Sequence, residues 1–338
     1  MNILITGGAG FIGSFLAERL IAEGHVVRVL DNLSTGSLSN LDAISSDSML
    51  DFQRGSVMDP AVVDDMVKSV DCVIHLASAV GVKLIMEQPS ASLLTNIVGT
   101  ENVLAACLKN NTRVFVASTS EVYGKSKSFP QGEQDDLILG ATENLRWSYA
   151  CSKICDEFLA LSYAREKNLP ATIVRFFNTT GPRQSSQYGM VLPNFVDAAM
   201  QGRKLLVHGT GEQSRCFCHV QDTVEAVVRL LALPEETAGE VFNIGNDQEV
   251  TIANLARRVI DKTASMSTIE YIPYKEVYGE GFEDMQRRVP SLTKLEAATG
   301  FRPRTPLETI IEDIQRERLE AELGNVDAAP RDTDRKRA

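Results

Sequence analysis

The stretch Thr6-Gly7-Gly8-Ala9-Gly10-Phe11-Ile12-Gly13 decides the fold of this chain. It follows a short apolar run at residues 2–6 and precedes an amphipathic stretch that ends at Gly24. A second apolar run, residues 26–30, ends in Asp31. This order predicts a strand, a glycine loop, a helix and a second strand with an acid at its end, which is the pattern of a dinucleotide-binding unit.

The glycines and the acid each have a physical role in such a unit. Gly7 and Gly10 let the backbone approach a pyrophosphate at the helix N-terminus, and Gly13 lets the helix pack close to the sheet. Asp31 would accept hydrogen bonds from both ribose hydroxyls and would repel a 2′-phosphate. We therefore predict NAD rather than NADP as the cofactor, with a tight structural turn that binds no ligand as the alternative.

Further residues of the cofactor site are expected at neighbouring strand ends. A buried strand over 71–77 is followed by Ser78 and Ala79, whose small side chains leave room for a cofactor. The residues predicted to bind NAD are Gly7, Gly10, Phe11, Ile12, Gly13, Asp31, Asn32, Leu76, Ala77, Ser78, Asn96, Ser118, Tyr149 and Lys153.

Tyr149 and Lys153 form a candidate proton-transfer pair. In a helix over 145–167 they occupy positions i and i+4 and project from one face. A neighbouring cation favours phenolate over phenol, so a tyrosine with an ordinary pKa of about 10 becomes a usable base near neutrality. Because this spacing also occurs by chance in many helices, a coincidental pair is the alternative.

A strand that starts at Arg113 turns polar at Ser118. Ligands of open parallel sheets bind outside the carboxyl ends of the strands, so Thr119, Ser120 and Glu121 would face the cofactor. Turn capping by these small polar side chains is the alternative.

The alternation of short apolar strands with helices predicts an α/β fold: a doubly wound parallel sheet of the Rossmann type with a smaller α/β C-terminal substrate domain. We expect an NAD-binding domain over 1–178 with a returning segment near 216–245. An interleaved substrate-binding domain would cover 179–315. The tail at 316–338 is charged and lacks apolar periodicity, so we expect it to be disordered beyond a last helix.

Composition limits the classes of partner. The 338 residues carry a net charge of −11, which argues against a nucleic-acid groove. No apolar run approaches the roughly 18 residues that span a membrane, and no basic leader precedes the first strand. We expect a cytoplasmic protein. The helix over 91–109 is apolar on more than one side, which predicts a homodimer packed through it and the helix of Tyr149, with packing inside the monomer as the alternative.

The six cysteines lie in apolar segments, so we expect reduced, buried thiols. The run Cys216-Phe217-Cys218-His219 could suggest a metal site, but no second Cys/His pair stands at a suitable spacing. We predict buried strand residues there and no metal.

Six motifs in this order resemble those of one enzyme family. They are TGGAGFIG at 6–13, Asp31, STSEVYG at 118–124, Tyr149-x-x-x-Lys153, FNTTGPR at 177–183 and GTGEQSR at 209–215. Together they are similar to the extended short-chain dehydrogenases that modify nucleotide sugars with NAD. The resemblance implies transient oxidation of a sugar carbon, with these catalytic residues: Thr119, Ser120, Glu121, Tyr149 and Lys153.

The prefix Arg146-Trp147-Ser148 is similar to the branch that decarboxylates UDP-glucuronate, whereas epimerases and dehydratases commonly have a Pro-Tyr step here. The runs at 137–140 and 278–290 resemble UDP-apiose/xylose synthase and the decarboxylase domain of the polymyxin-resistance enzyme. Ser120 stands where apiose synthases carry a cysteine, which speaks against ring contraction.

This resemblance implies decarboxylation of UDP-glucuronate to a UDP-pentose. A 4-keto uronic acid is a β-keto acid, so its carboxylate leaves as CO₂ without a metal. Glu121 and Arg215 would position the uronate and manage the proton at C5, and Arg146 would meet its anion. Arg215 is also a candidate for the diphosphate. The implied substrate-binding residues are Arg146, Asn178, Arg215 and Arg288.

Three other functions fit parts of the same pattern. A 4-epimerase acting on UDP-glucose or UDP-glucuronate would let the ketone rotate before reduction and needs no acid at Glu121. An NDP-sugar 4,6-dehydratase would use Glu121 as a base at C5. A non-catalytic NAD-responsive regulator on the same fold would not need the pair of Tyr149 and Lys153.

Overall fold

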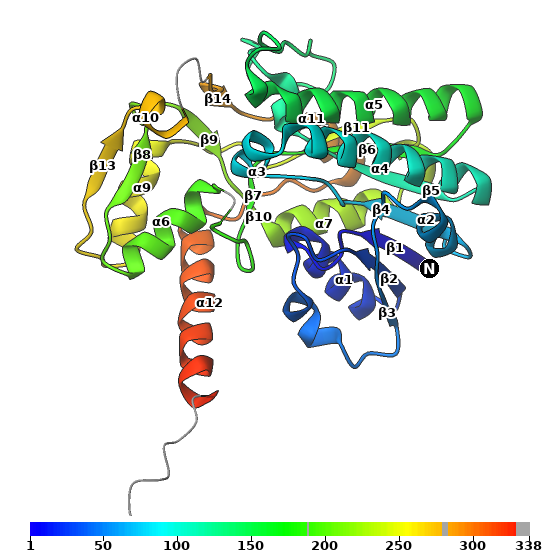
Figure 1. Ribbon diagram of the computed structural model, residues 1–338, viewed down its shortest axis with the longest axis horizontal. Helices are drawn as coiled ribbons and strands as arrows, with labels where there is room; N and C mark the ends of the chain where they lie inside the picture. Colours follow the sequence, from blue (N-terminus) through cyan, green and yellow to red (C-terminus); the bar gives the residue numbers. More distant parts are fainter. Residues whose placement is uncertain (188, 279–282, 329–338) are drawn as a thin grey trace, which may run out of the picture.

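A sheet of seven parallel strands forms the centre of the chain in the computed structural model, which describes residues 1–187, 189–278 and 283–328 (Figure 1). The strands are β1 (Asn2–Thr6), β2 (Val26–Asp31), β3 (Leu50–Arg54), β4 (Cys72–His75), β5 (Arg113–Thr119), β6 (Ala171–Phe176) and β11 (Val241–Ile244). Their order is β3-β2-β1-β4-β5-β6-β11, so the direction of strand addition reverses between β1 and β4. This is a doubly wound Rossmann sheet, and the predicted fold class is confirmed.

Helices cover both faces of this sheet (Figure 1). One face carries α1 (Phe11–Ala22), α7 (Val220–Leu231) and α11 (Thr293–Thr299), and the other carries α2 (Pro60–Val67), α4 (Pro89–Asn110) and α5 (Ser148–Lys167). Successive side chains of a strand point to opposite faces. Ile3 and Ile5 of β1 therefore join the first core and Leu4 joins the second, which explains why the strands are continuous apolar runs.

A smaller lobe has its own core around Phe195, Leu255 and Ile311. Its elements are α6 (Val191–Met200), β8 (Leu205–His208), β9 (Ser214–Cys216), β12 (Glu249–Thr251), α9 (Ile252–Lys262), β13 (Ile269–Ile272), α10 (Tyr274–Tyr278), β14 (Arg287–Arg288) and α12 (Leu307–Ala328). Strand β8 pairs with β13, and β9 lies between β12 and β14. A further pair joins β7 (Thr179–Thr180) to β10 (Cys218–His219).

The chain passes between the lobes more than once. After β6 it enters the smaller lobe, returns to the large sheet with α7 and β11, and leaves again for β12. The short helices of the large lobe are α3 (Val82–Glu87), α8 (Pro234–Thr237), η1 (Leu38–Ile44), η2 (Ser120–Tyr123) and η3 (Leu145–Trp147). The exact domain boundaries at residues 178 and 315 stay a prediction.

The charged tail differs from what the sequence suggested. Helix α12 runs to Ala328, whereas we expected order to end near residue 316. Arg318 in its second half forms ion pairs with Asp197 of α6 and with Glu317. The pair with Asp197 joins α12 to the smaller lobe beyond residue 316, so weak apolar periodicity did not mean absence of a helix. The predicted disorder at 329–338 lies outside the described residues.

Helix α4 requires a second correction. By length and composition α4 could cross a membrane, and the described residues contain one helix of this kind. We expected none. In this fold α4 packs between α2 and α5 and buries Val103, Leu104 and Cys107 in the core. The core helix of a protein can satisfy the same length and composition criteria as a membrane span, and the packing accounts for the apolar side chains on the buried side of α4.

Candidate active site

A cavity of about 1030 Å³ opens at the carboxyl ends of the sheet strands, between the two lobes. Its lining brings together almost all of the predicted site residues. These are Gly7, Gly10, Phe11, Ile12, Gly13, Asp31, Asn32, Leu76, Ala77, Ser78, Ser118, Thr119, Ser120, Glu121, Arg146, Tyr149, Lys153, Asn178, Arg215 and Arg288.

The glycine loop has the close contacts that its sequence predicted. Gly7 has a φ of +74°, and a Cβ there would lie 2.8 Å from the backbone nitrogen of Ala77. A Cβ on Gly13 would lie 2.4 Å from the carbonyl oxygen of Gly7. Within the described residues, no side chain caps the N-terminus of α1 at Gly10. This N-terminus therefore presents free backbone N–H groups, which suit the pyrophosphate of NAD.

Asp31 is held at the end of β2. Its Oδ2 accepts from the backbone nitrogen of Ala9 at 3.0 Å, and its Oδ1 accepts from that of Leu33 at 2.8 Å. Burial raises the pKa of Asp31, and these two hydrogen bonds oppose the rise. Asp31 lines the cavity, and each of its carboxylate oxygens can accept a second hydrogen bond, so the residue fits a ribose diol.

Asn96 does not belong to the lining of the cavity within the described residues, although we predicted that it binds NAD. Its side chain is buried behind the wall, where Oδ1 accepts from Ser78 Oγ at 2.9 Å and from Ala79 N at 2.8 Å. Its Nδ2 donates to Ser152 Oγ at 3.0 Å. Asn96 therefore supports the loop after β4 and α5 instead of facing the cavity.

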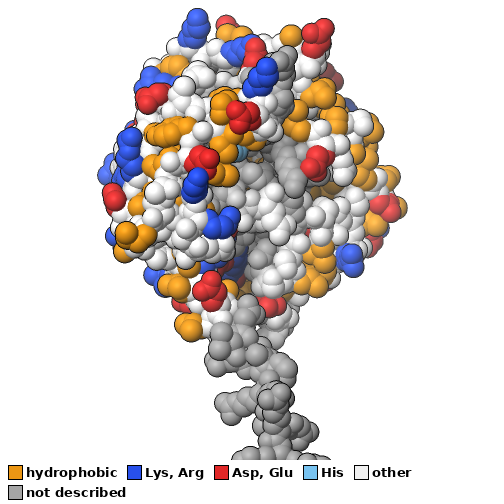
Figure 2. All heavy atoms as spheres, turned by 60° about the vertical axis from the view of Figure 1, so that its left-hand side comes forward, with side chains coloured by type: hydrophobic (Ala, Val, Ile, Leu, Met, Phe, Trp, Pro, Cys, Tyr) orange, Lys and Arg blue, Asp and Glu red, His pale blue; other side chains and the backbone are white. Residues whose placement is uncertain are grey.

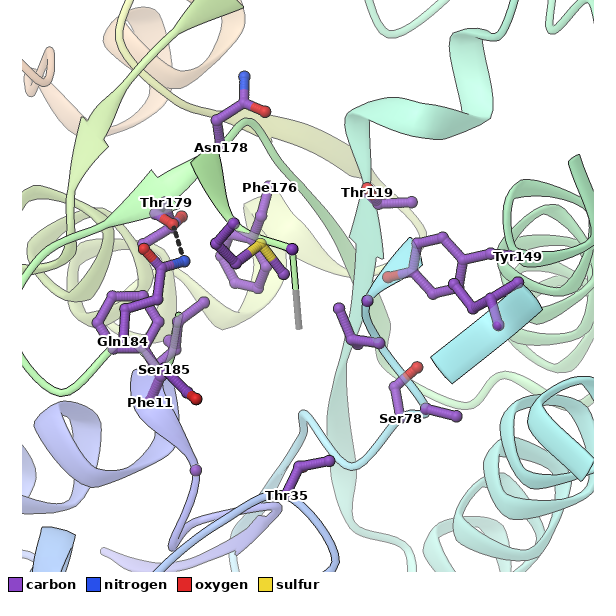
Figure 3. A pocket seen from close by; sticks show the side chains of 18 of the residues that line it. Phe11, Thr35, Ser78, Thr119, Tyr149, Phe176, Asn178, Thr179, Gln184 and Ser185 are labelled. Carbon is purple, nitrogen blue, oxygen red and sulfur yellow. Dashed lines mark hydrogen bonds between the residues drawn. The ribbon is translucent and has the colours of Figure 1, made fainter. Parts of the chain in front are cut away.

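Tyr149 projects from the first turn of α5 into the cavity, with its phenol close to Thr119 (Figure 3). A buried ion pair fixes this helix against the sheet: Arg175 of β6 donates from Nε and Nη2 to Glu157 at 2.9 and 2.7 Å. Ser118 at the end of β5 also donates to Glu157. The helix of Tyr149 is thus tied to the strand end that carries Thr119.

The pKa of Tyr149 departs from the sequence-based expectation. Burial raises it, and the carboxylates of Glu121 and Asp156 raise it further, while a hydrogen bond with Thr119 and the charge of Arg146 lower it. The Nζ of Lys153 donates to Asp156 Oδ2 at 2.7 Å, so a carboxylate that we did not predict competes with the phenol for this cation. The i, i+4 spacing could not show this competing carboxylate.

Charge is distributed differently on the surface and in the cavity. Acidic and basic side chains are interspersed on the face shown in Figure 2. Inside the cavity three arginines meet two carboxylates: Arg146, Arg215 and Arg288 surround Glu121 and Asp284. The cluster has a formal charge of +1 and adjoins the site of Tyr149. An anionic substrate group would neutralise it.

Glu121 is the best-paired member of this cluster. Arg146 donates to its two oxygens at 2.5 and 3.0 Å, and Arg288 Nη1 lies 3.5 Å from Oε1. Burial opposes the charge of Glu121, but the guanidinium groups of Arg146, Arg288 and Arg215 together hold its pKa below its usual value. Glu121 is therefore an ionised carboxylate and a weak base.

Asp284 and Tyr274 also belong to the site, although no sequence pattern predicted them. Asp284 Oδ2 accepts from Arg215 Nη2 at 2.9 Å and from the Tyr274 hydroxyl at 3.1 Å. Asp284 lies in the run at 278–290, yet no pattern of neighbouring residues indicates that it pairs with an arginine far away in the sequence. Residues 279–282 of that run lie outside the described residues.

The cysteines differ in exposure. Cys216 and Cys218 are buried in β9 and β10, as we predicted for that run. Cys151, by contrast, is exposed on α5 and Cys155 is half-buried, because their side of the helix faces away from the sheet. In the described part of the chain, no group of three or more His, Cys, Asp or Glu side chains could hold a metal ion.

Comparisons with known proteins agree with this site. The model of the NAD-dependent epimerase/dehydratase family matches residues 3–245. UDP-N-acetyl-alpha-D-glucosaminuronate decarboxylase from Bacillus cytotoxicus is 43% identical over 306 residues, which cover 90% of this chain and 94% of that protein. UDP-glucuronic acid decarboxylase 1 from Xenopus tropicalis is 35% identical over 309 residues, or 91% of this chain and 69% of that protein.

A dTDP-glucose 4,6-dehydratase from Streptomyces venezuelae, solved with NAD bound, has the same fold. The TM-score is 0.86 at 28% identity, and the match covers 96% of this chain and 98% of that one. The chain therefore belongs to the NAD-dependent epimerase/dehydratase family, as its motifs suggested. It is an enzyme, and its cofactor is NAD.

The glycine loop allows a direct test of the cofactor site. Gly13→Ala should weaken NAD binding by about 10-fold or more, because relieving the contact with Gly7 costs about 1–3 kcal/mol. Titration calorimetry measures the affinity. Gly132→Ala is the matched control, since a Cβ at this position would lie 3.8 Å from its nearest neighbour, Asp135 Oδ1. Equal affinity in the two variants would contradict the assignment of the loop.

Proposed function

We propose that the enzyme decarboxylates a UDP-linked uronic acid through transient oxidation at C4 and releases a UDP-pentose. The arginine cluster around Glu121 carries this proposal, because its net positive charge beside Tyr149 suits a sugar that bears a carboxylate. The two similar decarboxylases act on uronates that differ at C2, where one carries an acetamido group and the other a hydroxyl. Either substituent fits the proposal.

Tyr149 is the proposed base. When bound, NAD supplies the oxidant for the sugar C4 carbon and the reductant that later returns it to an alcohol. The phenolate of Tyr149 takes the proton of the C4 hydroxyl, and Thr119, hydrogen-bonded to the phenol, orients it. Ser120 lies beside Thr119 and accepts from Arg288 at 3.4 Å, so it helps to place this cation near the sugar.

The carboxylate then leaves as CO₂. The bond between C5 and the carboxyl carbon breaks, its electron pair moves toward the C4 ketone, and C5 takes up a proton from water. Arg146 holds the carboxylate before cleavage and can return to Glu121 when the anion is gone. The proposed ligands of the diphosphate are Arg215, Arg288 and Asn178. Arg215 also belongs to the charged cluster, so it is a second candidate to bind the carboxylate.

The pairing of Glu121 favours this reaction over dehydration. A 4,6-dehydratase needs a base that removes the proton at C5. The three arginines keep the pKa of Glu121 low, which makes it a poor base. A 4-epimerase of UDP-glucose has no carboxylate for this positive cluster to bind, so the cluster speaks against that reaction. A 4-epimerase of UDP-glucuronate would bind the same anion, and the analysis of the product separates it from a decarboxylase.

Product analysis tests the reaction. The enzyme, NAD and either UDP-glucuronate or UDP-N-acetylglucosaminuronate should give a product that has lost the mass of CO₂. In deuterated water it should carry solvent deuterium at C5. Tyr149→Phe should bind NAD and give no turnover. Formation of the galacturonate epimer without loss of mass would replace decarboxylation with epimerisation, and loss of water would indicate dehydration.

Arg146 can be tested by its selectivity for the carboxylate. Arg146→Met should lower kcat/KM for the uronate by about 10- to 100-fold, because the transition state loses a charge-assisted hydrogen bond to the carboxylate. Binding of UDP-glucose, which has no carboxylate, should stay nearly unchanged and serves as the control in the same variant. An equal loss for both ligands would show that Arg146 acts only on the shape of the cavity.

We propose in addition that two chains pair through α4 and α5. Leu94 and Val98 of α4 are 57% and 36% exposed, and Phe158 of α5 is 66% exposed. The two helices pack side by side, so these apolar side chains occupy the outer surface of one helix pair. Pairing would bury them in a bundle of four helices. Location in the cytoplasm stays a prediction.

A charge on this surface should separate the chains. Phe158→Asp should shift the protein from dimer to monomer in light scattering, because pairing would bury an unpaired carboxylate. Met266→Asp is the matched control, since Met266 is 95% exposed and lies outside both helices. A wild-type protein that is monomeric at micromolar concentration would contradict the dimer.

A further inference from the structure

A buried aspartate lies directly behind the catalytic pair. Asp156 follows Lys153 by one turn of α5, and Lys153 Nζ donates to its Oδ2 at 2.7 Å. The side chains are 0% and 3% exposed. The proposed reaction uses Tyr149 as its base and gives no task to this carboxylate.

A chain of buried polar side chains connects Asp156 to the glycine loop. Thr100 of α4 interacts with the carboxylate of Asp156, and His75 Nε2 lies 3.1 Å from Thr100 Oγ1. His75 Nδ1 lies 2.7 Å from Thr6 Oγ1, which also accepts from the backbone of Ala77 at 3.3 Å. Thr6 precedes Gly7, so the chain runs from the lysine to the cofactor loop.

The chemistry of the groups sets the direction of these hydrogen bonds. The carboxylate of Asp156 is an acceptor, so the hydroxyl of Thr100 can act on it only as a donor. Thr100 then accepts from Nε2–H of His75, and Nδ1 accepts from Thr6. This requires a neutral imidazole, and burial together with the charge of Lys153 lowers the pKa of His75 to about 3. The whole chain therefore donates toward Asp156.

Stability alone does not account for this arrangement. Oδ1 of Asp156 has no hydrogen bond of standard geometry within the described residues. A buried carboxylate oxygen without a good partner destabilises a fold, and buried ion pairs are often no more stable than apolar packing. A functional role is the better explanation of a charge at this place.

Asp156 acts electrostatically on Tyr149. The charged groups that bear on Tyr149 are Glu121 and Arg146 from the cavity wall and Asp156 from α5 itself. Lys153 and Glu157 of α5 bear on Asp156, together with Thr100 of α4. The negative charge of Asp156 favours the protonated phenol, and its contact with Lys153 engages the cation that would favour phenolate.

We propose that Asp156 is a positioning residue of the reaction, which holds the ammonium group of Lys153 beneath the cavity and so limits how strongly this cation assists Tyr149. The proposal rests on the proposed function only in taking Tyr149 as the base. Thr100, His75 and Thr6 lie one after another between Asp156 and the strand ends that also form the cofactor site.

Replacement of the charge by an amide tests this role. In Asp156→Asn the ionisation of Tyr149 should move to lower pH by about one pH unit or more. Ultraviolet titration of the NAD-bound enzyme without substrate measures it, as the difference between each protein and its Tyr149→Phe counterpart. The ascending limb of kcat/KM against pH should move in the same direction, because the phenolate persists to lower pH once the carboxylate is removed.

Thr172→Val is the matched control. Its hydroxyl is buried and donates to Thr237 O at 2.9 Å, outside the chain of Asp156. It should leave both pH dependences unchanged. If Asp156→Asn does not fold, Asp156→Ser removes the same charge. An unchanged titration of Tyr149 in a folded variant would overturn the proposal, whatever the substrate. A lower rate at all pH values, with the ascending limb of kcat/KM at the same pH as in the wild type, would show that Asp156 has a structural role only.

Discussion

The close contact between the backbones of Gly7 and Ala77 is the constraint on which the site depends. A Cβ on Gly7 would lie 2.8 Å from the backbone nitrogen of Ala77. The backbone that follows β1 therefore passes very close to the backbone that follows its neighbour β4. The amide of Ala77 also donates to Thr6, the first member of the polar chain that leads to Asp156. One backbone contact thus shapes the cofactor loop and orients the groups behind the catalytic lysine.

Two sets of buried charge act on Tyr149 from different sides. The arginine cluster with Glu121 lies on the substrate side, and Lys153 with Asp156 lies within the helix. Each set contains carboxylates that oppose phenolate and cations that favour it. Because several of these charges are already paired with one another, a ligand that draws an arginine or the lysine away from its carboxylate changes the balance at the phenol.

The sequence predicted the parts of the molecule that depend on local order. The glycine loop, the strand ends and the face shared by Tyr149 and Lys153 follow from spacing within one or two elements, and the cavity brings nearly all of those residues together. Partners from distant segments could not be predicted. No residue near Arg215 in the sequence indicates that Asp284 is its partner. Asn96 is polar enough to bind a ligand, but its side chain forms its hydrogen bonds with Ser78 and Ser152.

The position of β11 at the edge of the large sheet affects how the chain can be made. This strand pairs with β6, yet the polypeptide visits the smaller lobe between them. During synthesis the edge of β6 remains open until residue 244 has left the ribosome, and an open strand edge is a site for unwanted pairing. The two lobes are also interlaced by the chain, so no single cut separates a complete cofactor lobe from the rest. Exchange of the smaller lobe between relatives would therefore need at least two joins.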